Sequence, residues 1–147
     1  MSDTTSRDGP SLLVVGFDGS AGSHRALAYA AGMARREMSD LVVVEINRSD
    51  ADGASGIGFS LSPGAMQARR TGTLAKDVAW QLDELLPGRW WAEVGQGDAA
   101  DELARISNEL RSDAIVIGRS RGYFRRPLGC IADRLFRRVQ QPVIVVP

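Results

Sequence analysis

The sequence has almost none of the residues that form covalent or metal cross-links. It contains one cysteine and one histidine in 147 residues. One cysteine cannot form an internal disulfide, and one histidine leaves no His/Cys cluster of the kind that binds zinc. We therefore expect a protein of a reducing compartment, the cytoplasm, that is stabilised by an apolar core and has no intrinsic metal site.

Net charge and long apolar runs are also absent. The 18 Lys and Arg residues balance 18 Asp and Glu residues, so the formal net charge is zero. This balance argues against a nucleic-acid partner, although not against a local anion site. No apolar run approaches the roughly 18 residues that span a bilayer, and the first ten residues lack the pattern of a secretory signal. We expect a soluble protein without a membrane partner.

The length is that of a single ordinary domain. Residues 1–10 are polar, with nothing that a core could bury, and we expect a disordered tail there. Residues 11–147 are expected to form one domain, because the sequence contains no internal repeat and no composition break that would mark a second one.

Five short strands are predicted to alternate with helices. The strand candidates are residues 12–17, 41–46, 89–94, 114–117 and 143–146. Between them apolar residues recur every three or four positions, and Ser20 or Ser23 can begin the first helix, as Asp98 can a later one. Continuous apolar runs are typical of strands buried on both faces of a parallel sheet. The sequence therefore predicts a three-layer α/β fold with an open, parallel, five-stranded sheet, Rossmann-like in architecture.

Residues 47–64 interrupt this alternation. They are rich in Gly, Ser and Asp and show little periodicity. A connection this long is uncommon, so we expect either a mobile flap or a functional loop.

Two of the predicted strand ends carry residues suited to a nucleotide. In an open parallel sheet, ligands bind beyond the carboxyl ends of the strands, where the strand order reverses. Asp18 follows the first strand and offers a carboxylate to ribose hydroxyls, whereas Gly118 and Gly122 after the fourth strand allow backbone N–H groups to approach an anion. Each signal alone also fits a plain turn or a solvated loop. Neither a Walker loop nor G-x-G-x-x-G after the first strand is present.

Four blocks, in order and spacing, carry a family resemblance: LVVGFDGS at 13–20, DAIVIGRSRG at 113–122, GCIADRL at 129–135 and QPVIVVP at 141–147. Together they resemble the universal stress protein superfamily, and the resemblance covers residues 12–147. It implies strand order 3-2-1-4-5 and an adenine nucleotide alpha hydrolase-like fold, in agreement with the five predicted strands.

The loop after the fourth strand departs from the pattern of ATP-binding members, G-x2-G-x9-G-[ST]. Gly118 matches the first glycine, but Arg121 stands at the second and Gly122 comes one step later. Gly129 is two residues too early for the third glycine, and Cys130 replaces the hydroxyl residue. Since a thiol is a weak donor, only the backbone N–H of Cys130 would serve a phosphate well.

The resemblance implies ATP or another adenine nucleotide as ligand, with Mg²⁺ present only if the nucleotide brings it. It also implies the ribose contact by Asp18 and makes Ile46, at the end of the second strand, the adenine contact. The complete set of expected ligand-binding residues is Asp18, Gly19, Ile46, Gly118, Arg121, Gly122, Gly129 and Cys130. Arg121, Arg125 and Arg126 could compensate for the missing hydroxyl by charge-assisted hydrogen bonds.

The last strand, Val143 to Val146, is apolar and, by the implied strand order, lies at a sheet edge. An unprotected apolar edge invites pairing with another chain. The resemblance implies antiparallel self-association through this strand, so we expect a homodimer.

Two functions remain open from the sequence. The first is a stress-response dimer that binds an adenine nucleotide and is at most a weak ATPase, because no general base is evident and no catalytic residue is expected. The alternative is a dimer without a nucleotide that acts as a protein-interaction or signalling module, with a partner docking on residues 47–64. His24 is expected at an exposed rim, and Cys130 is either a packed small residue or a thiol sensor.

Overall fold

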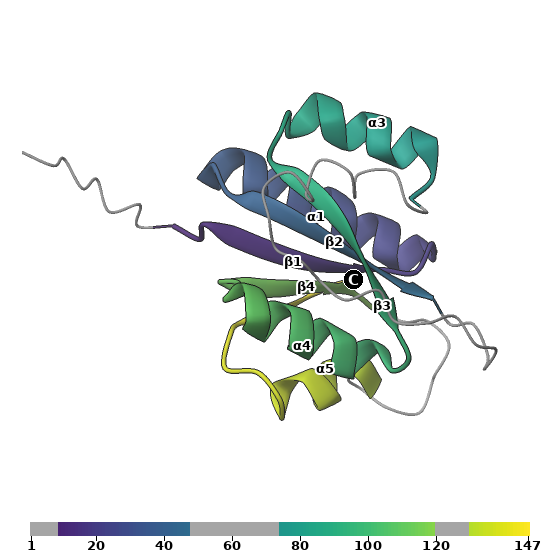
Figure 1. Ribbon diagram of the computed structural model, residues 1–147, viewed down its shortest axis with the longest axis vertical. Coiled ribbons are helices and arrows are strands. Elements are labelled where there is room, and N and C mark those ends of the chain that lie inside the picture. Colours follow the sequence, from purple (N-terminus) through teal and green to yellow (C-terminus); the bar gives the residue numbers. More distant parts are fainter. Residues whose placement is uncertain (1–8, 48–73, 120–129) are drawn as a thin grey trace, which may run out of the picture.

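The computed structural model describes residues 9–47, 74–119 and 130–147. Along the chain the elements are β1 (Leu12–Phe17), α1 (Ala21–Glu37), β2 (Asp40–Asn47), α3 (Lys76–Leu85), β3 (Trp90–Gln96), α4 (Ala99–Leu110), β4 (Ala114–Gly118), α5 (Cys130–Phe136) and β5 (Val143–Val146). Their alternation confirms the predicted α/β fold (Figure 1). Most of the expected tail and nearly all of the segment 47–64 lie outside the described residues.

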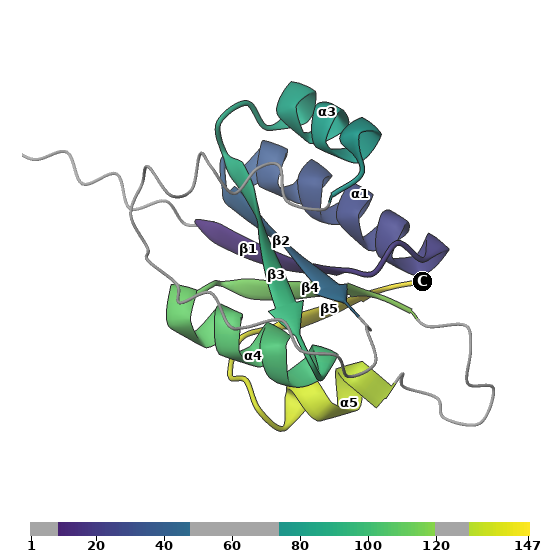
Figure 2. The ribbon, with the colours of Figure 1, turned by 45° about the vertical axis from the view of Figure 1, so that its right-hand side comes forward.

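The five strands form one parallel sheet in the order β3-β2-β1-β4-β5, as predicted. The chain moves outward from β1 to β2 and β3, then crosses to the other side of β1 to add β4 and β5. The strand order therefore reverses between β1 and β4. In Figure 2 the carboxyl ends of β1, β2 and β4 point to the right, where α1 also begins. This is the edge of the sheet at which such folds bind ligands.

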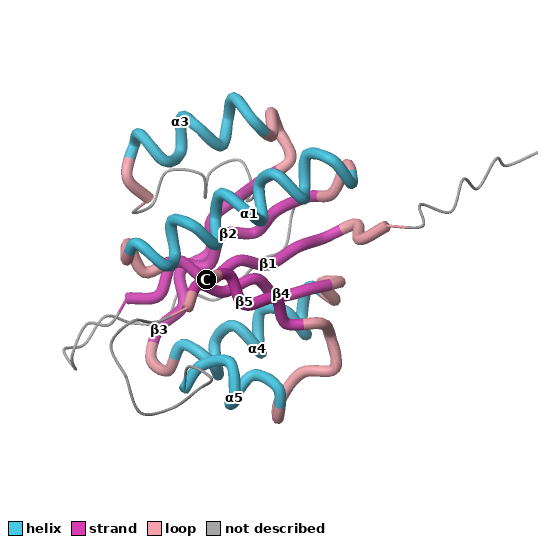
Figure 3. The backbone as a smooth tube through the Cα atoms, turned by 180° about the vertical axis from the view of Figure 1, so that it is seen from behind, coloured by secondary structure: helices cyan, strands magenta, loops and turns pink. Residues whose placement is uncertain are grey.

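Helices cover both faces of the sheet: α1 and α3 lie on one face, α4 and α5 on the other (Figure 3). Successive side chains of a strand point to opposite faces. Accordingly, Leu13 and Val15 pack in the α1/α3 core, whereas Val14 packs against the α4/α5 side. Trp90 packs in the α1/α3 core and Trp91 on the α4/α5 side, and both are buried. The sheet is thus the shared wall of two apolar cores.

Helix starts follow the predicted capping residues. The Ser20 side chain accepts a hydrogen bond from the Ser23 backbone N–H at 3.2 Å, which makes Ser20 the cap of α1. Two apolar residues of the cores lie just outside the helices. Leu74 precedes α3 and Val139 follows α5, yet both pack against a core. The apolar residues that pack against the cores therefore continue a few positions beyond the helix ends.

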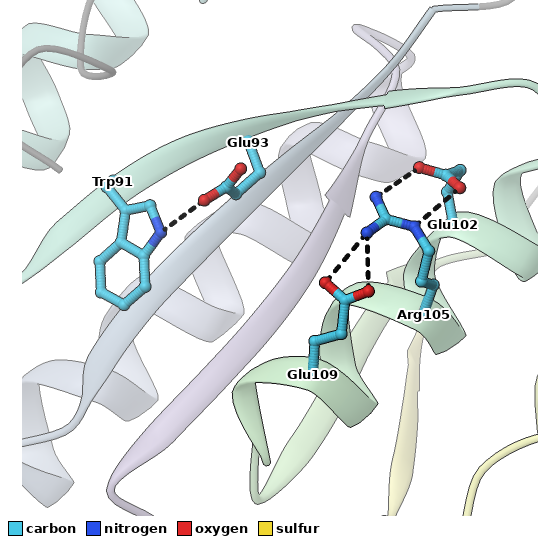
Figure 4. Close-up of polar contacts among 5 residues, drawn as sticks. All are labelled: Trp91, Glu93, Glu102, Arg105 and Glu109. Atoms are coloured by element: carbon cyan, nitrogen blue, oxygen red, sulfur yellow. Dashed lines mark hydrogen bonds and ion pairs between the residues drawn. The ribbon is translucent and has the colours of Figure 1, made fainter. Parts of the chain in front are cut away.

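Polar side chains form hydrogen bonds within α4 and within β3. Arg105 donates hydrogen bonds to Glu102 and Glu109 on neighbouring turns of α4, and the bonds with Glu102 raise its pKa (Figure 4). On β3, the buried Glu93 carboxylate accepts a hydrogen bond from the Trp91 indole at 3.2 Å. Within the described ranges, no helix combines the length and apolar character needed to cross a membrane.

Candidate functional site

A cavity of about 300 Å³ lies at the carboxyl end of the sheet, at the point where the strand order reverses. Its walls come from the end of β1 and the start of α1, from the end of β2, from the end of β4, and from the starts of α4 and α5. Asp18, Ile46 and Gly118 all line it. Three of the predicted site residues, far apart in the sequence, therefore share one cavity.

Asp18 turns the chain from β1 into α1. One of its carboxylate oxygens, Oδ1, accepts a hydrogen bond from the Ser20 backbone N–H at 2.9 Å. Gly19, between them, has a φ of +80°, a left-handed conformation that glycine adopts at little cost. Gly19 itself does not line the cavity, but it enables the turn that presents the exposed Asp18 side chain there.

Two glycines bring α1 and β4 into backbone contact beside the cavity. A Cβ atom on Gly118 would lie 2.2 Å from the carbonyl oxygen of Gly22, and one on Gly22 would lie 2.6 Å from the carbonyl oxygen of Arg119. Neither distance is possible for real atoms, and both neighbours are backbone. Glycine is therefore required at both positions to hold the first turn of α1 against the end of β4.

The cavity also has an apolar wall. Ile46, Leu103 and Ile131 contribute aliphatic side chains from β2, α4 and α5. Phe17 lines the cavity as well, and its ring meets the exposed His24 ring edge-on, with centroids 4.9 Å apart. Such a surface can accept the face of a planar, weakly polar group.

Arg119 supplies positive charge at the end of β4. It lines the cavity and its side chain is exposed. Its backbone N–H donates to the carbonyl oxygen of Val146 at 2.8 Å, which continues the pairing of β4 with β5. Among the lining residues that the structure describes, Arg119 is the one cation and Asp18 the one anion.

Ion pairs next to the cavity connect α5 to the start of α4. The Asp98 carboxylate caps α4 through the Asp101 backbone N–H and also accepts a hydrogen bond from Arg134 at 2.5 Å. Burial alone would raise the pKa of Asp98, but the hydrogen bonds from Arg134 and the backbone lower it overall. Since Ala99 lines the cavity, this pairing fixes one of its walls.

The other four predicted ligand-binding residues, Arg121, Gly122, Gly129 and Cys130, follow β4 in the sequence. Arg121, Gly122 and Gly129 lie outside the described residues, as do Arg125 and Arg126. Cys130 is the first residue of α5, but its side chain also falls outside the description. In the described parts of the chain, no group of three or more His, Cys, Asp or Glu side chains is arranged to hold a metal ion.

Several lining residues were not predicted from the sequence, among them Gly22, Arg119, Leu103 and Ile131. One local signal for Gly22 exists, because a glycine in the first turn of a helix is unfavourable without a reason such as close packing. Leu103 and Ile131 gave no such signal, because their spacing indicated only core-facing helix positions.

Comparison with known proteins identifies the family. The model of the universal stress protein family matches residues 12–147. The chain belongs to this family. A comparison with functionally curated proteins found no match.

Solved structures of the family share the fold. A universal stress protein in complex with cAMP is 20% identical, with a TM-score of 0.65, over 94% of this chain and 97% of the other. A family member from Burkholderia pseudomallei is 24% identical, with a TM-score of 0.63, over 93% and 96%. The universal stress protein from Archaeoglobus fulgidus in complex with dAMP is 20% identical, with a TM-score of 0.54, over 93% and 97%.

Proposed function

We propose that this universal stress protein binds an adenine nucleotide in the cavity between β1 and β4. The main support for the proposal is that Asp18, Ile46 and Gly118 line the same cavity of about 300 Å³. The volume is at the lower end of the range of small-molecule sites. The lining includes both polar side chains, such as Asp18 and Arg119, and aliphatic ones, such as Ile46 and Leu103, as a nucleotide requires.

The sheet order supports a specific orientation of the ligand. Because β2, β1 and β4 are adjacent, Ile46, Asp18 and Gly118 lie in that order along the edge of the sheet. Neighbouring strands are about 4.8 Å apart, so these three ends span about 10 Å. We place the base against Ile46, the ribose hydroxyls at the Asp18 carboxylate and the first phosphate at the backbone of Gly118.

Relatives support adenine nucleotides as the ligand class. Two solved family members with this fold were determined in complex with cAMP and with dAMP. Both ligands combine an adenine base with a sugar and a single phosphate. For this chain we assign further phosphate contacts to Arg121, Gly122, Gly129 and the backbone of Cys130, with Mg²⁺ bound only through the nucleotide.

Calorimetric titration with AMP, ADP and ATP tests the proposal directly. The informative variant is Asp18→Asn, because its side-chain oxygen can still accept the Ser20 N–H bond while the carboxylate charge is lost. We expect wild type to bind at least one of the nucleotides and Asp18→Asn to bind it about tenfold more weakly. Asp40→Asn is the matched control, because Asp40 is exposed at the start of β2, at the opposite edge of the sheet. Absence of heat and of a thermal shift with all three nucleotides would refute the proposal.

We also propose that two copies pair through β5. Among the described strands, β5 pairs with β4 alone, and Val143 to Val146 are only half-buried. An apolar, half-covered edge is a surface for strand pairing. Equilibrium sedimentation at micromolar concentration should give the mass of a dimer, and a monomer would contradict this.

A nucleotide-free interaction module is the second candidate function. The shortened loop after β4 and the cysteine at position 130 favour it. In this case the dimer would persist while the nucleotide titrations showed no binding. The two experiments above therefore separate the two functions.

A further inference from the structure

We propose that Arg119 makes the cavity select phosphorylated nucleosides over uncharged ones. The inference rests on the proposed nucleotide function and adds the residue that determines ligand charge. Sequence patterns pointed instead to the arginines at 121, 125 and 126, which follow later in the same loop.

The backbone of Arg119 is held in place from two sides. Its N–H donates to the Val146 carbonyl oxygen at 2.8 Å, so the residue extends the β4–β5 pairing by one step. Its carbonyl oxygen lies so close to Gly22 that a Cβ there would be 2.6 Å away. The side chain of Arg119 therefore starts from a fixed point at the cavity wall, although it follows the last residue of a strand.

The Arg119 side chain is available for a ligand. It is exposed and has no ion-pair partner among the described residues. Other arginines of the molecule contrast with it: Arg105 is engaged by two glutamates, and Arg134 by Asp98 and Asp101. A guanidinium without a carboxylate partner beside a cavity suits a phosphate, which it can bind through two parallel hydrogen bonds.

The distribution of charge around the cavity gives the selectivity. Asp18 lies at the end of β1 and Arg119 directly after β4, the neighbouring strand. An uncharged nucleoside would use the carboxylate of Asp18 through its hydroxyl groups and leave the arginine without a partner. A nucleoside monophosphate extended from β1 toward β4 would bring its phosphate to Arg119. Arg119 should therefore bind the phosphate of a charged ligand, and Asp18 should bind the ribose hydroxyls of charged and uncharged ligands alike.

The test compares adenosine with AMP by calorimetry at low salt in wild type, Arg119→Gln and Arg119→Lys. We expect wild type to bind AMP about tenfold more tightly than adenosine. Arg119→Gln should reduce this ratio to below about twofold while adenosine affinity stays the same. Arg119→Lys keeps the charge but loses the two-pronged geometry, so an intermediate ratio is expected.

Arg35→Gln is the control, because Arg35 is an exposed arginine in the last turn of α1, away from the cavity lining. It should leave the ratio unchanged. Added salt should lower the AMP-to-adenosine ratio of wild type and have little effect on that of Arg119→Gln. Thermal melting of each variant verifies that the fold is retained.

The outcomes separate this inference from the proposed function. An unchanged AMP-to-adenosine ratio in a folded Arg119→Gln variant would overturn the inference and leave nucleotide binding standing. Failure of wild type to bind either ligand would overturn the proposed function, and the inference with it. Equal loss of adenosine and AMP affinity would also contradict the inference, because it would show that Arg119 supports the cavity as a whole.

Discussion

Polar side chains have different roles at the two ends of the sheet, the end where the strands begin and the end where they finish. Where the strands begin, side chains bond to the chain itself. Asp113, just before β4, accepts hydrogen bonds from the backbone N–H groups of Ser11 and Leu12 at 2.7 and 2.9 Å. Where the strands end, Asp18 and Arg119 line a cavity. The first arrangement joins β1 to β4 and stabilises the fold, whereas the second leaves room for a ligand.

A second hollow, at the end of the sheet where the strands begin, shows the same difference between the two ends. It lies between the end of α4 and the start of β5, and polar residues line it. Two of these, Asn108 and Gln141, hydrogen-bond to each other at 3.2 Å. A third, Asp113, is engaged by Ser11 and Leu12. Three side chains that line this hollow, Asn108, Asp113 and Gln141, therefore already have hydrogen-bond partners within the chain.

The largest effect is expected from Gly118→Ala. The new methyl group would meet the carbonyl oxygen of Gly22 at 2.2 Å, and a backbone atom cannot move aside cheaply. We expect the free energy of unfolding to fall by about 3 kcal/mol, measured by urea denaturation. The same substitution at Gly32, in α1, is the control: its nearest neighbour is the flexible end of Arg36 at 3.4 Å, so Gly32→Ala should raise stability by about 0.5–1 kcal/mol. Equal effects at the two glycines would disprove the close contact.

The next effect concerns Asp113→Ala. This variant loses the hydrogen bonds that connect the start of β1 to the start of β4, and we expect it to lower the free energy of unfolding by about 2 kcal/mol. Asp18→Ala loses the hydrogen bond from the Ser20 backbone N–H and should lower the free energy of unfolding by about 1 kcal/mol while removing the ribose contact. If Asp18→Ala were the more destabilising of the two, the division between a structural edge and a binding edge would be wrong.

The smallest expected effect is a change with pH in the contribution of Asp113 to the free energy of unfolding. Burial would raise the pKa of Asp113, but hydrogen bonds from Leu12 and Ser11 lower it below its ordinary value of 3.8. As pH falls, the unfolded chain therefore takes up a proton at this group before the folded chain does. The contribution of Asp113 is present above about pH 4 and disappears as the pH falls through the lowered value.

Urea denaturation of wild type and Asp113→Ala between pH 6 and pH 3 measures this. The stability difference between the two proteins should narrow toward acid. A difference that stayed constant or widened would show that Asp113 acts without its charge.

The sequence was sufficient for the fold and for part of the cavity. Strands and helices followed from apolar runs and from caps such as Ser20, and the order of the strands followed from the family resemblance. Asp18 was predictable because it directly follows the first strand, at the end of the sheet where open parallel folds bind ligands. The contact of Gly22 with Arg119 was not predictable, because it depends on how closely α1 approaches β4, which no local pattern encodes. Leu103 and Ile131 read as ordinary core positions for the same reason.

The most direct test of the account is an amide NMR titration of the protein with AMP. If AMP binds in the cavity, chemical shifts should change for Gly16 to Ser23, for Ile46, and for Gly118 and Arg119. They should stay constant for Asn108 to Asp113 and for Gln140 and Gln141. Shift changes confined to the second group, or spread equally over both edges of the sheet, would contradict it.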